Sequence, residues 1–121
     1  MNNRILICDD TAFMRKLLTE ILIGSGYDVV GEAENGKIAI EKFKALKPDV
    51  TLMDITMPEL DGIKALEGIM SSDNNARVIM CSAMGQENIV VDAIKKGAKD
   101  FVVKPFQNER IIDAIQRVMN R

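Results

Sequence analysis

Hydrophobic and polar positions follow two different spacings along the chain, and the alternation between them predicts the fold. Short apolar runs, such as residues 4–8 and 78–81, stop at polar residues, as strands buried in a parallel sheet do. Between these runs, apolar residues recur every three or four positions, which is typical of one buried helix face. The pattern therefore predicts strands and helices in strict alternation.

The alternation is repeated five times within 121 residues. The expected strands cover residues 4–8, 27–31, 50–53, 78–81 and 101–103. The first helix is expected to bury one stripe made of Phe13, Met14, Leu17, Leu18, Ile21 and Leu22. Five strand–helix units predict an α/β fold, in which a five-stranded parallel sheet of order 2-1-3-4-5 is flanked by five helices in a doubly wound arrangement. Residues 1–121 are expected to form one domain, since no linker separates the units.

Polar side chains gather where the predicted strands end. Asp9 and Asp10 follow the first strand, Asp54 the third, Ser82 the fourth and Lys104 the fifth. In a sheet of order 2-1-3-4-5 these four strands are neighbours about 4.8 Å apart, and their carboxyl ends line one edge. A single Asp at a strand end is commonly structural, but structural needs do not collect three Asp residues, a Ser and a Lys on one edge. The pattern predicts a functional site there.

The charges at this edge favour a divalent cation. Two carboxylates about 4 Å apart repel each other by roughly 4 kcal/mol at an effective dielectric constant of 20. Three carboxylates therefore need more positive charge than Lys104 supplies. Mg²⁺ prefers oxygen ligands and commonly uses one or two carboxylates while it keeps several waters. Such an ion would also neutralise an incoming phosphoryl group, so we expect Mg²⁺ as the cofactor.

The composition excludes several other functions. The chain has no histidine, so it has neither a Ser-His-Asp nor a Cys-His catalytic centre and cannot form a phosphohistidine itself. A net charge of −2 does not suggest the basic face that binding to nucleic acid requires. No apolar run approaches the roughly 20 residues of a membrane span, and no signal peptide is evident. We expect a cytoplasmic protein in which Cys8 and Cys81 are free thiols, on strands too far apart for a disulfide.

The strand-end residues belong to longer motifs with a specific combined spacing. Asp9-Asp10, Asp54, the segment 57–62 (Met-Pro-Glu-Leu-Asp-Gly), Ser82-Ala83 and Lys104-Pro105-Phe106 together resemble response-regulator receiver domains. The resemblance covers essentially the whole chain and implies a flavodoxin-like fold. Within the family, residues 53–59, 81–87 and 97–101 resemble the chemotaxis regulators of Gram-positive bacteria and Thermotoga-like lineages.

The resemblance implies a role for each acidic residue. Asp54 would be the phosphoacceptor, which takes a phosphoryl group from a phosphohistidine on a separate kinase. Asp10, Asp54 and the backbone carbonyl of Thr56 would ligate Mg²⁺, and Asp9 would act mainly through water. Lys104 would pair with Asp54 at rest and with a phosphoryl oxygen afterwards. Phosphoryl transfer of this kind depends mostly on positioning and charge neutralisation.

The resemblance also implies a conformational response at the same edge. Ser82 would move to bond a phosphoryl oxygen, and Phe101 would swing inward behind it; Phe101 has no phenolic hydroxyl, so its contribution would be packing alone. A plain core aromatic is the equally supported alternative for Phe101. Thr56 and Met84 would flank the path of attacking water and so tune dephosphorylation. The Lys104–Pro105 peptide bond would be cis.

The resemblance implies a protein that acts by binding other proteins and not by catalysing repeated reactions. The chain would be a phosphoacceptor and not an enzyme, and its length leaves no room for a DNA-binding output domain. Its partners would be a CheA-type histidine kinase, flagellar motor switch proteins and a CheC- or CheX-type phosphatase, with no nucleic acid and no membrane insertion. The protein would act as a monomer through the face formed by its fourth helix, fifth strand and fifth helix. Two alternatives remain open: a phosphorelay intermediate, and a Mg²⁺-dependent phosphatase with an Asp nucleophile.

Overall fold

The computed structural model describes residues 3–120, so residues 1, 2 and 121 of the predicted domain lie outside it. Its strands are β1 (Arg4–Cys8), β2 (Asp28–Ala33), β3 (Val50–Met53), β4 (Val78–Ser82) and β5 (Asp100–Val103). They form one sheet of order β2-β1-β3-β4-β5 in which every neighbouring pair is parallel. The predicted α/β architecture and strand order are confirmed. The second strand, however, starts one residue later and ends two residues later than the apolar run 27–31 suggests.

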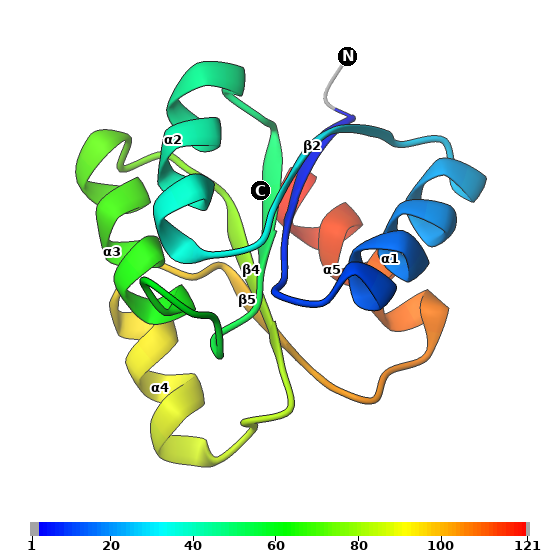
Figure 1. The fold of residues 1–121 in the computed structure, drawn as a ribbon. Coiled ribbons are helices and arrows are strands. Elements are labelled where there is room, and N and C mark those ends of the chain that lie inside the picture. The colour runs from blue at the N-terminus through cyan, green and yellow to red at the C-terminus, as the bar shows by residue number, and fades with distance from the viewer. Residues whose placement is uncertain (1–2, 121) are drawn as a thin grey trace.

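Within residues 3–120, five helices cover the two faces of the sheet, as predicted. They are α1 (Ala12–Gly24), α2 (Gly36–Leu46), α3 (Gly62–Ser72), α4 (Glu87–Lys95) and α5 (Asn108–Met119). Helices α2, α3 and α4 lie on one face of the sheet, and α1 and α5 lie on the other (Figure 1). Because each helix leads back across the sheet, every strand ends at the same edge, which we call the carboxyl edge; the opposite edge is the amino edge.

Each face of the sheet has its own buried core, because successive side chains of a strand point to opposite faces. Leu6 and Met80 pack in the cluster beneath α2, α3 and α4. Ile7 and Ile79 pack in the cluster beneath α1 and α5. The same alternation places Cys8 and Cys81 in different clusters, and β3 separates their strands. Both cysteines are buried and free, as expected.

Helix α1 corrects one detail of the predicted core. Leu18 and Leu22 are buried as the stripe requires, but the Phe13 side chain is 77% exposed. Thr11 caps the helix, with its side chain accepting a hydrogen bond from the Met14 amide, so Phe13 lies in the first turn. This turn starts beside the carboxyl edge, four residues after β1 ends at Cys8. The periodicity of the stripe is right, but its first member is not part of the core.

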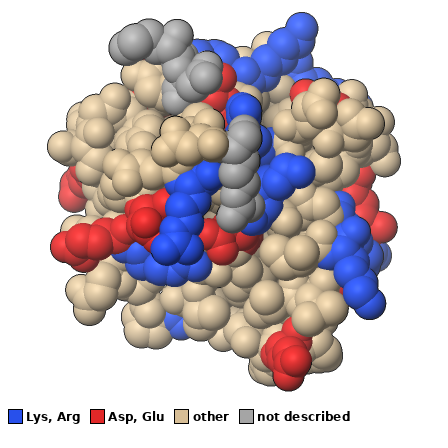
Figure 2. All heavy atoms as spheres, turned by 180° about the vertical axis from the view of Figure 1, so that it is seen from behind, with Lys and Arg blue, Asp and Glu red and all other residues tan. Residues whose placement is uncertain are grey.

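The surface carries both signs of charge. On the face opposite to the view of Figure 1, Lys and Arg side chains lie next to Asp and Glu side chains, with uncharged surface around them (Figure 2). Among the residues that the structure describes, no helix is long and apolar enough to cross a membrane.

Candidate functional site

The carboxyl edge brings the three predicted acidic residues together. One carboxylate oxygen from each of Asp9, Asp10 and Asp54 lies within 4.8 Å of the others. The juxtaposition follows from the sheet: β1 and β3 are paired neighbours, and the Asp54 amide donates a 2.9 Å hydrogen bond to the Cys8 carbonyl. Two adjacent strand ends therefore hold all three carboxylates in one place.

The cluster is buried on one side and open on the other. Asp9 and Asp54 are 2% and 7% exposed, whereas Asp10 faces solvent. Burial raises the pKa of the Asp54 carboxyl; the Lys104 ammonium partly offsets this rise, and the charge of Asp9 adds to it. One Asp54 oxygen, Oδ1, accepts a 2.8 Å hydrogen bond from the Ile55 amide. The three carboxylates form a hard oxygen donor set with solvent access at Asp10, which suits a partly hydrated Mg²⁺.

Lys104 lies between two of the carboxylates. Its Nζ donates a 2.7 Å hydrogen bond to Asp9 Oδ2 and lies 3.5 Å from Asp54 Oδ2. The resemblance implies that Lys104 pairs with Asp54 at rest, but in the structure its nearer partner is Asp9. Burial alone lowers the pKa of Lys104, but the hydrogen bond to Asp9 and the charges of Asp54 and Asp9 outweigh it, so this pKa is raised. Lys104 is therefore a charged ammonium shared by two carboxylates.

The loops after β3 and β4 meet beside the acidic cluster. Ser82 is buried, and its Oγ accepts a 3.1 Å hydrogen bond from the Met84 amide. The Ser82 carbonyl accepts a 2.9 Å hydrogen bond from the Lys104 amide, which ties the ends of β4 and β5 together. At the rim, the exposed Thr56 hydroxyl lies 3.5 Å from the Met84 sulfur. The side chains of Thr56 and Met84 thus bring the loops after β3 and β4 into contact.

Phe101 lies on β5 opposite Met80, and its side chain is 7% exposed within the core cluster beneath α2, α3 and α4. This inward position fits both interpretations of Phe101, and the switch hypothesis stays a prediction. The Lys104–Pro105 peptide bond is cis, as the resemblance implies.

Two residues that shape the site are not among the site residues predicted from the sequence. The Gly62 amide donates a 2.7 Å hydrogen bond to the Ile55 carbonyl, and a Cβ at Gly62 would lie only 1.8 Å from the Asp54 carbonyl oxygen. Arg15 reaches back from α1, and its Nη1 donates a 2.7 Å hydrogen bond to the Asp9 carbonyl. The glycine that ends the 57–62 motif is a signal for Gly62, but nothing in the sequence pattern distinguishes Arg15 from other exposed charges on a helix.

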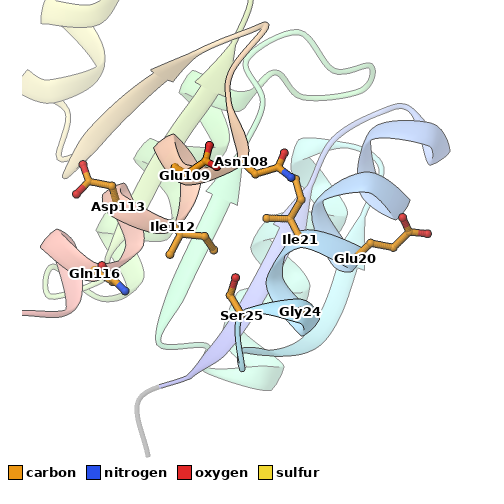
Figure 3. A pocket seen from close by; sticks show the side chains of 9 residues that line it. All are labelled: Glu20, Ile21, Gly24, Ser25, Asn108, Glu109, Ile112, Asp113 and Gln116. Atoms are coloured by element: carbon orange, nitrogen blue, oxygen red, sulfur yellow. The ribbon is translucent and has the colours of Figure 1, made fainter.

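A hollow of about 590 Å³ lies between α1 and α5. Ile21 and Ile112 line it, with Glu20, Glu109 and Asp113 among the acidic residues around it (Figure 3). None of the predicted site residues lines this hollow. It is separate from the acidic cluster.

The response regulator receiver domain model matches residues 5–116. The chain belongs to the response regulator receiver family. The match includes all the residues gathered at the carboxyl edge, and it favours the receiver over the alternative of an Asp-nucleophile phosphatase. Receivers are phosphoacceptor regulators and typically use Mg²⁺, and the acidic cluster of this receiver is consistent with such a site.

Curated relatives narrow the family assignment. The receiver is 57% identical over 118 residues to the chemotaxis protein CheY of Thermotoga maritima, with 98% of both chains covered. It is 58% identical over 120 residues to CheY of Bacillus subtilis, covering 99% of this chain and 100% of that protein. These similarities support a chemotaxis response regulator, of the lineage type that the motifs suggest.

Solved structures agree with the fold. A chain of the CheX–CheY–BeF₃–Mg²⁺ complex from Borrelia burgdorferi is 42% identical with a TM-score of 0.93, covering 95% of this receiver and 87% of that chain. The response regulator domain of Thermotoga maritima CheB is 39% identical with a TM-score of 0.93, covering 100% and 98% of the two chains.

Proposed function

We propose that this receiver accepts a phosphoryl group on Asp54 from a phosphohistidine of a CheA-type histidine kinase. A carboxylate oxygen of Asp54 attacks phosphorus, the phosphorus–nitrogen bond breaks, and the released imidazole takes a proton. The observation that carries the proposal is the convergence of three carboxylate oxygens within 4.8 Å beside Lys104. Because the chain has no histidine, the phosphohistidine has to be on another protein.

Mg²⁺ would be held at the open side of the acidic cluster. Asp10, Asp54 and the backbone carbonyl of Thr56 are the proposed ligands, with Asp9 acting mainly through water. When bound, the ion supplies positive charge that offsets the repulsion between the carboxylates and the phosphoryl oxygens. Asp9 meanwhile keeps the Lys104 ammonium at the site, because it accepts the 2.7 Å hydrogen bond.

Lys104 and Ser82 are proposed to bind the phosphoryl oxygens. Lys104 already lies 3.5 Å from Asp54 Oδ2, so a small shift away from Asp9 would bring its ammonium to a phosphoryl group on Asp54. The Ser82 hydroxyl would turn toward another phosphoryl oxygen, and Phe101 would occupy the space behind it. Thr56 and Met84, whose side chains are in contact, would limit the approach of water and so set the dephosphorylation rate.

The output surface is proposed to be the face formed by α4, β5 and α5. Val91, Ile94 and Val103 are between 43% and 46% exposed there, so this face presents apolar area to a partner. Flagellar motor switch proteins would bind it after phosphorylation. A CheC- or CheX-type phosphatase is a further proposed partner, since the Borrelia CheY occurs in a complex with CheX. The protein would act as a single-domain cytoplasmic monomer without binding nucleic acid.

The direct test is phosphorylation by acetyl phosphate, followed by intact mass spectrometry. We expect a phospho-adduct in wild type with Mg²⁺, no adduct after chelation, and no adduct in Asp54→Asn. Rapid turnover of unrelated phosphate esters without an adduct would contradict the proposal and favour a phosphatase.

The output is tested separately with a peptide from a motor switch protein. Phosphorylated protein should bind the peptide at least several-fold more tightly than unphosphorylated protein. Equal binding of the two forms, together with phosphoryl transfer to a second histidine protein, would favour a phosphorelay intermediate instead.

A further inference from the structure

Arg15 joins the acidic site to β2 through a chain of contacts. Its Nη1 donates a 2.7 Å hydrogen bond to the Asp9 carbonyl, and its Nε donates a 3.0 Å hydrogen bond to Glu32 Oε1. The Arg15 side chain is only 17% exposed, although it lies near the start of a surface helix. The rigid, planar guanidinium is thus held by two contacts, one to the Asp9 carbonyl and one to the Glu32 carboxylate.

A contact to the Asp9 carbonyl affects the neighbouring residue Asp10 as well. It belongs to the same planar peptide unit as the Asp10 amide, so fixing its oxygen also fixes the direction in which the chain enters Asp10. Every other polar group of Asp9 is also bonded: its amide to the Ala33 carbonyl and its carboxylate to Thr11 and Lys104. Asp9 is therefore rigid, and the Asp10 side chain, which faces solvent, is aimed from this rigid base.

We propose that Arg15 is a positioning residue that holds the Asp9–Asp10 peptide so that the Asp10 carboxylate meets the cation. The inference rests on the proposed function, because it requires a cation site at the acidic cluster. Arg15 touches neither the cation nor the phosphoryl group in this role. It acts through the backbone of its neighbours, as the outer partners of metal ligands commonly do.

The positioning role and simple electrostatics predict opposite changes in Mg²⁺ affinity when Arg15 is replaced. A positive charge near a cation site repels the cation, so removing the guanidinium charge would by itself tighten Mg²⁺ binding. Loss of the hydrogen bond to the Asp9 carbonyl would loosen Asp10 and weaken Mg²⁺ binding. The sign of the change in affinity therefore separates the two effects.

The experiment is calorimetric titration of Mg²⁺ into the full chain, with Mn²⁺ binding followed by electron paramagnetic resonance as a second readout. We expect the Mg²⁺ Kd of Arg15→Gln to rise about tenfold. Arg15→Lys keeps the charge but replaces the two donor nitrogens of the planar guanidinium by a single ammonium on a flexible stem, so its Kd should lie between those of wild type and Arg15→Gln. Lys16→Gln is the matched control, since it removes an exposed positive charge from the same helix; its Kd should stay the same or fall slightly.

Phosphorylation by acetyl phosphate adds a readout that general damage to the fold would not reproduce. The rate at which Arg15→Gln is phosphorylated should be low at limiting Mg²⁺ and should return to near the wild-type rate at saturating Mg²⁺. An unchanged or tighter Mg²⁺ Kd in Arg15→Gln overturns the inference. If that variant fails to fold, an unchanged Mg²⁺ Kd in Arg15→Met, which also lacks the donor to the Asp9 carbonyl, overturns it. Absence of Mg²⁺ binding by wild type would contradict the proposed function itself, whereas equal binding by wild type and Arg15→Gln contradicts only this inference.

Discussion

The two edges of the sheet both carry charged residues, but only one edge gathers them into a site. At the amino edge, the charged groups bond one by one to nearby backbone. The Arg4 amide donates to Asp49 Oδ2 at 3.0 Å, and the Arg4 guanidinium donates to the Lys47 carbonyl at 2.9 Å. These groups are partly exposed and serve to fasten the ends of the strands.

At the carboxyl edge, the same kinds of groups converge, and two of the three carboxylates, those of Asp9 and Asp54, are buried. Asp9, Asp10 and Asp54 share a region 4.8 Å across, and Lys104 lies between two of them. The contrast shows that convergence and burial, rather than the number of charges, distinguish a functional edge from a structural one. Like charges held together away from water raise the free energy of the site, and the binding of a cation lowers it again.

The largest difference between the two edges should appear in Mg²⁺ binding. Asp10→Asn removes a proposed ligand, so the Mg²⁺ Kd should rise by a factor on the order of 10 to 100. Asp49→Asn removes a carboxylate from the amino edge and should leave the Kd unchanged. Calorimetric titration measures both variants. Equal effects of the two substitutions would mean that total charge, and not the site, attracts the ion.

A methyl group added to a glycine should also affect stability differently at the two edges. Gly62→Ala would place a Cβ 1.8 Å from the Asp54 carbonyl oxygen, so it should lower the free energy of unfolding by about 2–3 kcal/mol. Gly24, at the end of α1 near the amino edge, has open space around it. Gly24→Ala should be neutral or should stabilise the protein by about 0.5–1 kcal/mol, because alanine favours helix. Urea denaturation distinguishes the two, and a tolerated Gly62→Ala would show that the β3–α3 loop shifts easily.

Removing one positively charged side chain from each edge should change the free energy of unfolding by a smaller amount. Lys104→Gln leaves Asp9 and Asp54 without their ammonium partner and should lower the free energy of unfolding by about 2 kcal/mol in the absence of Mg²⁺. Arg117→Gln breaks only an exposed pair with Asp113 at the end of α5 and should change stability little.

The loss of unfolding free energy caused by Lys104→Gln should depend on pH, and the direction of that dependence can be predicted. The pKa of Lys104 is raised above 10.5, so its contribution is fully present at neutral pH and is lost as the pH rises past that value. Urea denaturation at pH 7 and at high pH measures it. If the difference in unfolding free energy between wild type and Lys104→Gln grew with pH, Lys104 would not be the stabilising ammonium of the site.

The smallest response is expected from the two thiols beside the acidic site. Burial raises the pKa of Cys81 to about 12 and raises that of Cys8 further, so neither thiol is ionised at pH 8. Both should resist iodoacetamide at pH 8 in the native protein and should react promptly in guanidinium chloride. Mass spectrometry counts the adducts, and rapid labelling of the native form would show that the sheet opens near the site.

Most of the fold could be predicted from local pattern. The apolar run 50–53 and the polar residue after it define β3 and its end without reference to any neighbour. Phe13 was predicted wrongly because periodicity defines a helix face but not which of its positions the rest of the structure covers. The convergence of Asp9, Asp54 and Lys104 was predictable as well, because parallel strands end at a common edge.

The sequence by itself determined the elements, their order and the chemistry at the strand ends, since these depend on spacing along the chain. Only the tertiary structure decided which carboxylate Lys104 bonds, how closely Gly62 approaches Asp54, and that Arg15 holds the Asp9 carbonyl. These contacts join segments whose separation is set by loop packing to within a fraction of an ångström. Hydrophobic periodicity carries no information at that scale, because it records which face of an element is buried and not which atoms meet.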